Sequence, residues 1–364
     1  MDFKLSGEQT LIKDSVDRFV QQPSAGRDAW SEFTKLGWLG IGAPEELGGF
    51  GGPVETMLVM DAFGRGLLLE PYAACAVFPS AILRAARRND LLEKLIEGER
   101  FAVAYEEPQA RYDPTQIATG AERASGGYVL RGRKVRIGAP RVATTFIVSA
   151  RCGDGSALFA VPDHAKGVQR HDAATEDGAN AVTLDLDGVM VGDEARIGSA
   201  DGSALLQEGL DYAVGAVCAE AVGLMSAMFD MTLEYLKVRS QFGVTIGSFQ
   251  ALQHRMAEML MELELARSMA YLAAMTLQDE ARPEARSRAI SGAKVQVARS
   301  GRFVGQNAVQ LHGAIAMTEE YRLGGYFKRM TTLERIYGDT DYHLTRYASL
   351  TATQAAASPE RAAV

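Results

Sequence analysis

Apolar positions near the start of the chain recur at helical spacing. Ser6 and Gln9 form an S-x-x-Q capping box ahead of the first apolar series. Helical spacing resumes at 54–63 and again at 73–87. The segment 44–53 (PEELGGFGGP) is too rich in Gly and Pro for a helix and is expected to be a loop. The N-terminal part is therefore predicted to be helical.

The pattern changes in the middle of the chain to short runs rich in β-branched and aromatic residues, separated by turn residues. The runs lie at 128–132, 146–150, 158–162 and 182–191. Gly153-Asp154-Gly155 is a plausible hairpin connection between two of them. This zone is predicted to be a small antiparallel β domain.

Long helical series return after residue 200. Apolar residues of one series are spaced 4, 3, 4, 3, 4 along the chain, and a second series repeats the spacing with Lys294 as its one polar member. The two series are Leu252, Met256, Met259, Leu263, Ala266, Ala270 and Ile290, Lys294, Val297, Gly301, Val304, Ala308, Leu311. The fold class predicted is α+β: an N-terminal helical domain at 1–99, a central antiparallel β domain at 100–200, and a C-terminal four-helix bundle at 201–364 with a frayed tail.

Composition narrows the class of protein. The 364 residues carry a net charge of −8, which argues against a nucleic-acid partner. Cys75, Cys152 and Cys218 are scattered, and neither they nor the five histidines show metal-ligand spacing. We expect no signal peptide, no membrane span and a cytoplasmic location.

A loop between two helical series carries an arginine among glycines, in the string RSQFGVTIGSFQ that starts at Arg239. Its guanidinium is a bidentate donor. The amides of Gly243 and Gly247, with a helix expected to begin at Ser248, add positive dipole. Such a loop can hold a phosphate, although an ordinary helix connection explains the same residues.

A second segment, QLHGAIAMTEEY, begins at Gln310. Taken alone, Gly313 is a helix C-cap and Thr318-Glu319 begins the next helix. His312 is expected to be structural like the other histidines, but it lies inside this segment.

Both strings resemble signatures of the acyl-CoA dehydrogenase superfamily. The first is similar to R-x-x-F-G-x-x-I-x-x-F-Q, whose arginine and glutamine reach the FAD of a partner subunit. The second is similar to Q-x-x-G-G-x-G, with alanine at 314 and 316 in place of glycine. The resemblance covers nearly the whole chain and implies FAD as cofactor. It assigns to FAD the residues Arg239, Gln241, Phe242, Gln250, Gln310, Gly313, Ala314 and Thr340.

The segments that line the flavin ring in this family are changed. EEPQARYD resembles T-E-P-x-A-G-S-D, but Glu106 replaces threonine, and Arg111 and Tyr112 replace Gly-Ser. KVRIGAP is similar to K-x-W-I-T-N, but Arg136 replaces tryptophan and Gly138 replaces threonine. An ordinary β-hairpin with exposed basic residues explains the second string equally well.

The catalytic base of the family is missing from both of its known positions. The string IYGDTDY resembles I-Y-E-G-T, whose glutamate removes the substrate α-proton, and Gly338 stands there. The alternative position falls at Ala213. Asp339 is the candidate catalytic carboxylate, but one residue along a helix turns a side chain by about 100°. A cap or ion-pair role is the competing interpretation.

Relative to the family signatures, the residues that contact a neighbouring subunit's FAD are retained, and the residues around the chain's own flavin ring are replaced. Within the family, the chain looks closest to the small-subunit branch of pimeloyl-CoA dehydrogenase. This implies a half-active subunit that pairs with a paralogous dehydrogenase, acts on an acyl-CoA, and passes electrons to an electron-transfer flavoprotein. A self-sufficient homo-oligomeric enzyme and a non-catalytic scaffold or binding relative are the alternatives.

Overall fold

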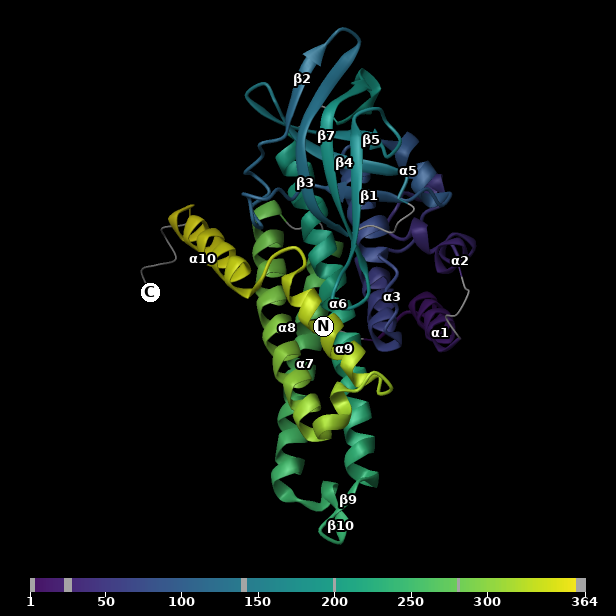
Figure 1. Cartoon of the computed structure of the whole chain (residues 1–364), viewed down its shortest axis with the longest axis vertical. Coiled ribbons are helices and arrows are strands. Elements are labelled where there is room, and N and C mark those ends of the chain that lie inside the picture. Colours follow the sequence, from purple (N-terminus) through teal and green to yellow (C-terminus); the bar gives the residue numbers. More distant parts are fainter. Residues whose placement is uncertain (1–3, 23–27, 139–142, 199–200, 280–281, 358–364) are drawn as a thin grey trace. The chain divides into compact units, whose positions relative to one another are not determined.

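The computed structural model describes residues 4–22, 28–138, 143–198, 201–279 and 282–357, with side chains to Thr353. Helices come first, strands follow, and long helices complete the chain (Figure 1). The chain folds into two compact units. We call them the helical unit (residues 1–23, 53–68 and 214–364) and the sheet unit (residues 24–52 and 69–213). The fold is α+β, as predicted.

The sheet unit is built on an eight-stranded sheet with the order β6-β7-β3-β2-β4-β5-β8, and β1 pairs with β4. Its described strands are β1 Phe101–Ala104, β2 Gly120–Ala124, β3 Gly127–Gly138, β4 Thr145–Cys152, β5 Gly155–Pro162, β6 Val168–Ala174, β7 Asn180–Gly192 and β8 Arg196–Ile197. The sheet is mainly antiparallel, but β4 pairs in parallel with β1 and at one point with β2. All four runs predicted as strands lie in β3, β4, β5 and β7.

The hairpin between β4 and β5 forms where it was predicted. Cys152 pairs with Gly155, so Gly153 and Asp154 are the two loop residues. Gly153 has φ 61°, which a residue without Cβ adopts at little cost. The strands on either side are mostly buried.

Short helices complete the sheet unit: α2 Ala29–Lys35, α4 Phe78–Ala85, α5 Asn89–Ile96 and the π-helical turn Ala73–Val77. An aromatic cluster fixes α2 in place. Phe33 contacts Trp30, Trp38 and Tyr72 with ring centroids 5.6–6.0 Å apart. The Tyr72 hydroxyl donates to the Trp38 carbonyl (2.5 Å), so this buried hydroxyl is satisfied.

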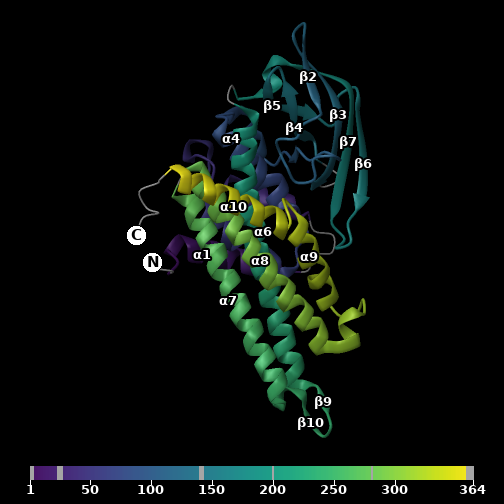
Figure 2. The same cartoon turned by 90° about the vertical axis from the view of Figure 1, so that its left-hand side faces the viewer.

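The helical unit contains α1 Gly7–Gln21, α3 Pro53–Gly66, α7 Gln250–Gln278, α8 Pro283–His312, α9 Leu323–Arg335, α10 Thr340–Ala357 and the end of α6 Gly202–Val238. The helices α6, α7 and α8 run side by side (Figures 1 and 2). Both predicted seams are buried, apart from the half-buried Leu252. Lys294, the polar member, donates to the Leu333 carbonyl at the end of α9 (2.5 Å).

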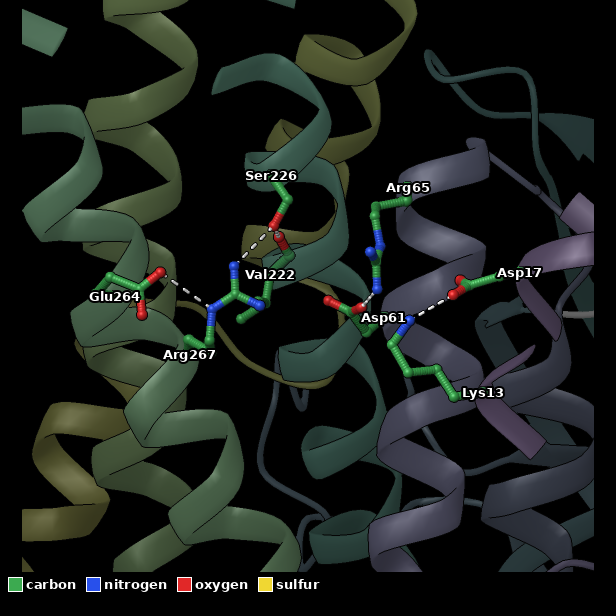
Figure 3. A network of polar contacts seen from close by, with 8 residues as sticks. All are labelled: Lys13, Asp17, Asp61, Arg65, Val222, Ser226, Glu264 and Arg267. Carbon is green, nitrogen blue, oxygen red and sulfur yellow. Dashed lines mark hydrogen bonds and ion pairs between the residues drawn. The ribbon is translucent and has the colours of Figure 1, made fainter. Parts of the chain in front are cut away.

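Close backbone packing joins α3 to α6. A Cβ on Gly223 would lie 1.9 Å from the Asp61 carbonyl oxygen, and one on Gly64 would lie 2.0 Å from that of Glu220. Polar side chains flank this crossing (Figure 3). Asp61 pairs with Arg65 within α3, and Arg267 of α7 donates to Ser226 of α6 (3.3 Å). The helices therefore pack through small residues at the centre and polar contacts beside it.

One described helix, α6, is long and apolar enough to cross a membrane. Its most apolar window is 78% buried inside the protein. A core helix of a soluble protein has the same composition, and burial accounts for the apolar character of α6.

The N-terminal capping box is confirmed. The Ser6 hydroxyl accepts from the Gln9 amide (3.1 Å), and the Gln9 side chain accepts from the Ser6 amide (3.0 Å). This reciprocal pair satisfies two N–H groups at the start of α1.

Candidate active site

The loop after α6 folds into a short hairpin with an exposed tip. Strands β9 (Ser240–Gln241) and β10 (Val244–Thr245) pair antiparallel. The tip residues Phe242 and Gly243 have φ of 54° and 80°, as a type I′ turn requires. The Phe242 side chain is 91% exposed. The hairpin therefore presents an aromatic ring to solvent.

The helix start predicted at Ser248 is wrong by two residues. α7 begins at Gln250, and the Ser248 hydroxyl instead donates to the Thr245 carbonyl (2.6 Å). The reason is a short 3-10 turn over Ile246–Ser248 that precedes the helix. A helix N-terminus still follows the loop, and Gln250 is its first residue.

Arg239 is exposed at the base of this hairpin. Its amide donates to the Tyr235 carbonyl (2.9 Å), and its own carbonyl accepts from the Ile246 amide (2.8 Å). Among the described residues, no carboxylate forms an ion pair with its guanidinium. Gln241 and Gln250 are also exposed. These side chains offer hydrogen bonds to an anion from outside the chain.

The second predicted segment begins where α8 ends. Gly313 caps the helix as predicted, with φ 69° and ψ −147°, a region that glycine alone occupies readily. A Cβ at this position would meet nothing within 4 Å, so the backbone angle, and not space, favours glycine. Ala314 and Ala316 avoid positive φ, which explains how alanine fits there. Gln310 and Ala314 are exposed.

The predicted helix start at Thr318-Glu319 is wrong. A 3-10 turn over Gly313–Met317 follows α8, and α9 begins only at Leu323. The Thr318 hydroxyl donates to the Ile315 carbonyl (3.0 Å) and closes this turn. The exposed segment after Gly313 is therefore longer than the sequence pattern indicated.

The two predicted segments meet at one end of the helical unit. Tyr235 near the end of α6 stacks on His312 at the end of α8. Near the start of α7, Arg255 donates to the Asn307 side chain (2.8 Å). These contacts link the helices that carry the two segments. The cofactor roles of Arg239, Gln250, Gln310 and Gly313 stay predictions.

Asp339, the predicted candidate base, caps α10. Its Oδ1 accepts from the Tyr342 amide (2.9 Å), three residues along, as an N-cap side chain does. Asp339 is half-buried. This geometry supports the cap interpretation of Asp339. The base assignment stays a prediction.

Gly338 is enclosed by the next turn of the chain. Its φ is 118°, and a Cβ would lie 2.5 Å from Tyr342 Cδ1 and 2.7 Å from His343 Nε2. His343 is 1% exposed, and its Nε2 lies 3.0 Å from the Tyr337 carbonyl. Burial, together with the charges of Lys294 and Arg346, lowers the pKa of His343 to about 3. The ring is therefore neutral and holds this turn in place.

Thr340 is the one predicted cofactor residue at the start of α10. Its hydroxyl oxygen is buried and makes no hydrogen bond to any described residue. A buried unpaired hydroxyl costs free energy, so it favours a partner from outside the chain. This orphan hydroxyl is consistent with the predicted contact to FAD.

The alternative base position, Ala213, is fully buried. Two residues earlier, Asp211 is also fully buried and accepts from the Gln207 side chain (3.2 Å). Two residues turn an α-helix by about 200°, so Asp211 does not share the direction of Ala213. Asp211 was not among the residues predicted from the sequence, although an acidic residue within an apolar helical series is a visible signal.

A buried ion pair lies in the sheet unit at the segments that line the flavin ring in the family. Lys134 Nζ is 2.7 Å from Glu107 Oε1, and both side chains are at most 2% exposed. Glu107 also accepts from the amides of Ala118 (2.8 Å) and Thr119 (3.0 Å). Burial alone would raise the pKa of Glu107, but Lys134 and Thr119 hold it at about 2. We interpret this pair as structural, because its hydrogen bonds join neighbouring segments of the same unit.

Three of the changed residues bond to one another. Arg136 Nε donates to Glu106 Oε2 (2.7 Å), and Arg136 Nη2 donates to the Arg111 carbonyl (2.9 Å). Glu106 is 8% exposed and also accepts from the Tyr105 hydroxyl (3.1 Å). Arg111 and Arg136 have φ of 50° and 53°, in the left-handed region. We call Glu106, Arg111 and Arg136 the arginine cluster.

The remaining changed positions are Tyr112 and Gly138. Tyr112 lies under the Arg111 guanidinium, 5.8 Å from the ring centroid. Gly138 is exposed, and its carbonyl accepts from Cys75 Sγ (3.6 Å). The end of the KVRIGAP string, at 139 and 140, lies outside the described residues. In the described part of the chain, no three His, Cys, Asp or Glu side chains gather as metal ligands.

Comparison with known proteins identifies the fold. Family models match most of the chain: the acyl-CoA dehydrogenase N-terminal domain at 6–99, the middle domain at 102–188 and the C-terminal domain at 200–349. Benzylmalonyl-CoA dehydrogenase of Aromatoleum aromaticum is 30% identical over 355 residues, which cover 90% of this chain and 93% of that protein.

Two solved structures share the fold at 24% identity. The FAD complex of PigA has a TM-score of 0.88 and covers 97% of this chain and 100% of its own. The ChsE4-ChsE5 complex from Mycobacterium tuberculosis has a TM-score of 0.85, with 97% and 99% covered.

A helical domain, a middle sheet domain and a C-terminal bundle define the class of flavin-dependent oxidoreductases that act on acyl-CoA. The chain belongs to the acyl-CoA dehydrogenase family. Its cofactor is FAD.

The residues of the Arg239 loop, of Gly313 and of the start of α10 fit FAD, and the residues of the arginine cluster do not. Arg239, the Gly313 backbone and the orphan Thr340 hydroxyl offer donors and open space. The arginine cluster places the Glu106–Arg136 ion pair, which is bonded to the Arg111 carbonyl, at the positions that line the flavin ring in the family.

Proposed function

We propose that this chain is the half-active subunit of a heteromeric acyl-CoA dehydrogenase. It contributes the end of its helical unit to an FAD whose ring lies in a paralogous partner. One observation carries the proposal: the arginine cluster is bonded within itself, while Arg239 and Phe242 remain exposed. This combination is expected of a chain that contributes residues to its partner's cofactor site and whose own flavin-ring positions are filled by side chains.

The reaction is α,β-desaturation of an acyl-CoA thioester. When bound, FAD accepts the hydride from the substrate β-carbon, while a carboxylate removes the α-proton. Arg239 would hold the FAD pyrophosphate through its bidentate guanidinium, and the N-terminus of α7 would add positive dipole. Gly313 would leave room beside the cofactor because it carries no side chain.

The base comes from the partner subunit in this proposal. Gly338 and Ala213 have no titratable group, and Asp339 already caps α10. Gly338 also has no space for a side chain, because Tyr342 and His343 enclose it. The chain therefore binds and orients the cofactor, and its partner removes the proton.

An exposed apolar face on α7 supports a partner subunit. Met261, Leu265 and Leu272 are 60%, 51% and 39% exposed and lie at spacings of 4 and 7, on one side of the helix. Leu260 beside them is 44% exposed. Apolar residues grouped in this way mark association surfaces. A solved structure with this fold, the ChsE4-ChsE5 complex, is named for two different proteins.

The proposal includes three finer points. Within the family, the small-subunit branch of pimeloyl-CoA dehydrogenase is the assignment that the sequence strings favour. The electron acceptor is an electron-transfer flavoprotein. The complex is cytoplasmic, in keeping with the free thiols of Cys75, Cys152 and Cys218.

A self-sufficient homo-oligomer is the second candidate, and one observation favours it. Asp211 is a buried carboxylate on the helix that carries the alternative base position, and it would act from a different direction than a side chain at 213. In that case the purified chain alone is yellow and reduces an electron acceptor with acyl-CoA. A scaffold role predicts a flavin-free chain that stays inert with its partner.

Flavin counting tests the proposal. The chain is purified alone and after co-expression with a paralogous acyl-CoA dehydrogenase subunit, and FAD is measured per chain by absorbance after denaturation. We expect a flavin-free chain alone and an active, flavin-loaded complex. Stoichiometric FAD and turnover in the chain alone would refute the half-active role.

The variant Arg239→Ala tests whether this side chain contributes to FAD binding. Loss of a charge-assisted, bidentate contact is expected to weaken FAD binding by the complex about 10- to 100-fold. Arg335→Ala is the matched control, because Arg335 is an exposed arginine at the end of α9. Equal FAD affinity in both variants would count against the donor role of Arg239.

A further inference from the structure

His312 lies in an aromatic stack that joins three segments distant in sequence. It is the last residue of α8 and is 4% exposed. The Tyr235 ring of α6 stacks on it at 4.4 Å between centroids with an interplanar angle of 26°. The Tyr321 ring, from the segment before α9, lies 5.2 Å away at 49°. The stack therefore connects α6, α8 and the stretch that leads to α9.

Its hydrogen bonds define the tautomer of the ring. Nδ1 lies 2.8 Å from the Ala308 carbonyl, which only accepts, so Nδ1 carries the hydrogen. Burial lowers the pKa of His312 by more than the carbonyls of Ala308 and Met231 raise it, which keeps the ring neutral. Nε2 is then an acceptor for the Tyr321 hydroxyl at 3.0 Å. Burial raises the pKa of Tyr321, so its hydroxyl stays protonated and donates.

Each end of the stack borders a segment that faces FAD in the proposed function. Arg239 lies one helical turn after Tyr235, and its amide donates to the Tyr235 carbonyl (2.9 Å). Gly313 follows His312 directly, at the point where the backbone leaves the helix with φ 69°. A shift of the His312 ring would therefore move the Arg239 loop relative to the Gly313 segment.

No other residue type supplies the same set of contacts. A phenyl ring keeps the stacking but loses both hydrogen bonds. A carboxamide keeps a donor and an acceptor but loses the flat ring that Tyr235 covers. The Arg255–Asn307 hydrogen bond ties α7 to α8 separately, so His312 governs chiefly the relation between α6 and α8.

We infer that His312 is a positioning residue for FAD binding. Its stack and hydrogen bonds fix the distance between the Arg239 loop and the Gly313 segment, so that both reach one cofactor. This inference rests on the proposed function for the cofactor, but the ordering of the two segments by His312 can be measured without flavin.

Two variants and a matched control test it. His312→Phe removes both hydrogen bonds, and Tyr321→Phe removes only the hydroxyl and keeps the packing. Tyr326→Phe is the control, because its buried hydroxyl likewise donates to a carbonyl, that of Arg65 (2.6 Å), in the same helical unit. All three are measured in the full chain and in its complex with the partner.

Amide hydrogen exchange of the chain is the first readout. We expect faster exchange in residues 239–249 and 313–321 for His312→Phe and, to a smaller extent, for Tyr321→Phe. The Tyr326→Phe control should leave both segments unchanged. Unchanged exchange in His312→Phe, or the same increase in the control, would overturn the positioning role.

FAD affinity of the complex, followed by flavin fluorescence, is the second readout. A loss of about tenfold is expected for His312→Phe, corresponding to one or two hydrogen bonds. If Arg239→Ala weakens FAD binding and His312→Phe does not, the inference is wrong. If Arg239→Ala has no effect while exchange still rises in His312→Phe, the proposed cofactor role has failed and the ordering by His312 stands.

Discussion

Placing a side chain at Gly338 should destabilise the helical unit instead of restoring a catalytic base. The family glutamate would stand at this position, so Gly338→Glu is the obvious repair. The backbone, however, has φ 118°, and a Cβ would lie 2.5 Å from Tyr342 Cδ1 and 2.7 Å from His343 Nε2. His343 cannot move aside freely, because its ring is buried and bonded to the Tyr337 carbonyl.

Two effects contribute to the expected loss. A residue with a Cβ held in this backbone region costs about 1–3 kcal/mol. Forcing Tyr342 and His343 apart in a packed region costs a further ~1–3 kcal/mol. Gly338→Ala should therefore lower the free energy of unfolding by roughly 2–6 kcal/mol, a fall in Tm on the order of 10 °C. Gly338→Glu adds the desolvation of a charged group and should lose more.

Thermal unfolding followed by circular dichroism measures this loss. Gly243→Ala is the control, because Gly243 also has positive φ (80°) but has nothing within 4 Å of a Cβ. It should lose only about 1 kcal/mol, from the backbone alone. The difference between the variants isolates the clash. A Gly338→Ala chain as stable as the Gly243→Ala chain, or a Gly338→Glu chain that folds and gains turnover, would refute the reasoning.

Three further predictions follow from the site. Asp339→Asn keeps the cap of α10, so turnover of the complex should stay within a few-fold of normal in steady-state kinetics, and a loss of about 10²–10⁴-fold with flavin retained would make Asp339 the base. The folded pKa of His343 is lowered to about 3 against an ordinary value of about 6.5, so the unfolded chain takes up the proton first as the pH falls. The free energy of unfolding should therefore decrease below about pH 6.5, by about 2 kcal/mol at pH 5. Urea titrations at about pH 6.5 and pH 5 should show this decrease, and His343→Gln should lose it. Lys134→Met leaves the Glu107 carboxylate buried without its cation and should cost about 3–5 kcal/mol in urea unfolding, part of which the added Glu107→Gln should restore; full stability of the single variant would show that the pair is not needed.

Local patterns in the sequence determined much of the architecture. The Ser6–Gln9 capping box and the turn at Gly153 follow from interactions within a few residues, and the spacing of apolar residues predicted which faces of α7 and α8 are buried. Such features are readable because helical and strand periods place apolar side chains on one face. The same local patterns predicted a loop between two helices at Arg239 and a glycine cap at Gly313.

Tertiary structure alone decided how the changed residues behave. Glu106 and Arg136 are 30 residues apart in the sequence. They form a hydrogen bond in the structure, where β3 has an irregular register between Lys134 and Ile137. Asp339 and Gly338 are neighbours in sequence, but their roles depend on whether α10 begins at Thr340 and on where His343 packs.

The His312 stack depends on the tertiary structure in the same way. Tyr235 and Tyr321 lie 77 residues before and 9 residues after His312 in the sequence, and no periodic pattern links them. Spacing along the chain shows which face of an element is buried, but it does not show which distant side chain lies opposite. Contacts between elements set hydrogen-bond partners, tautomers and free space, and those contacts exist only once the helices and strands have packed.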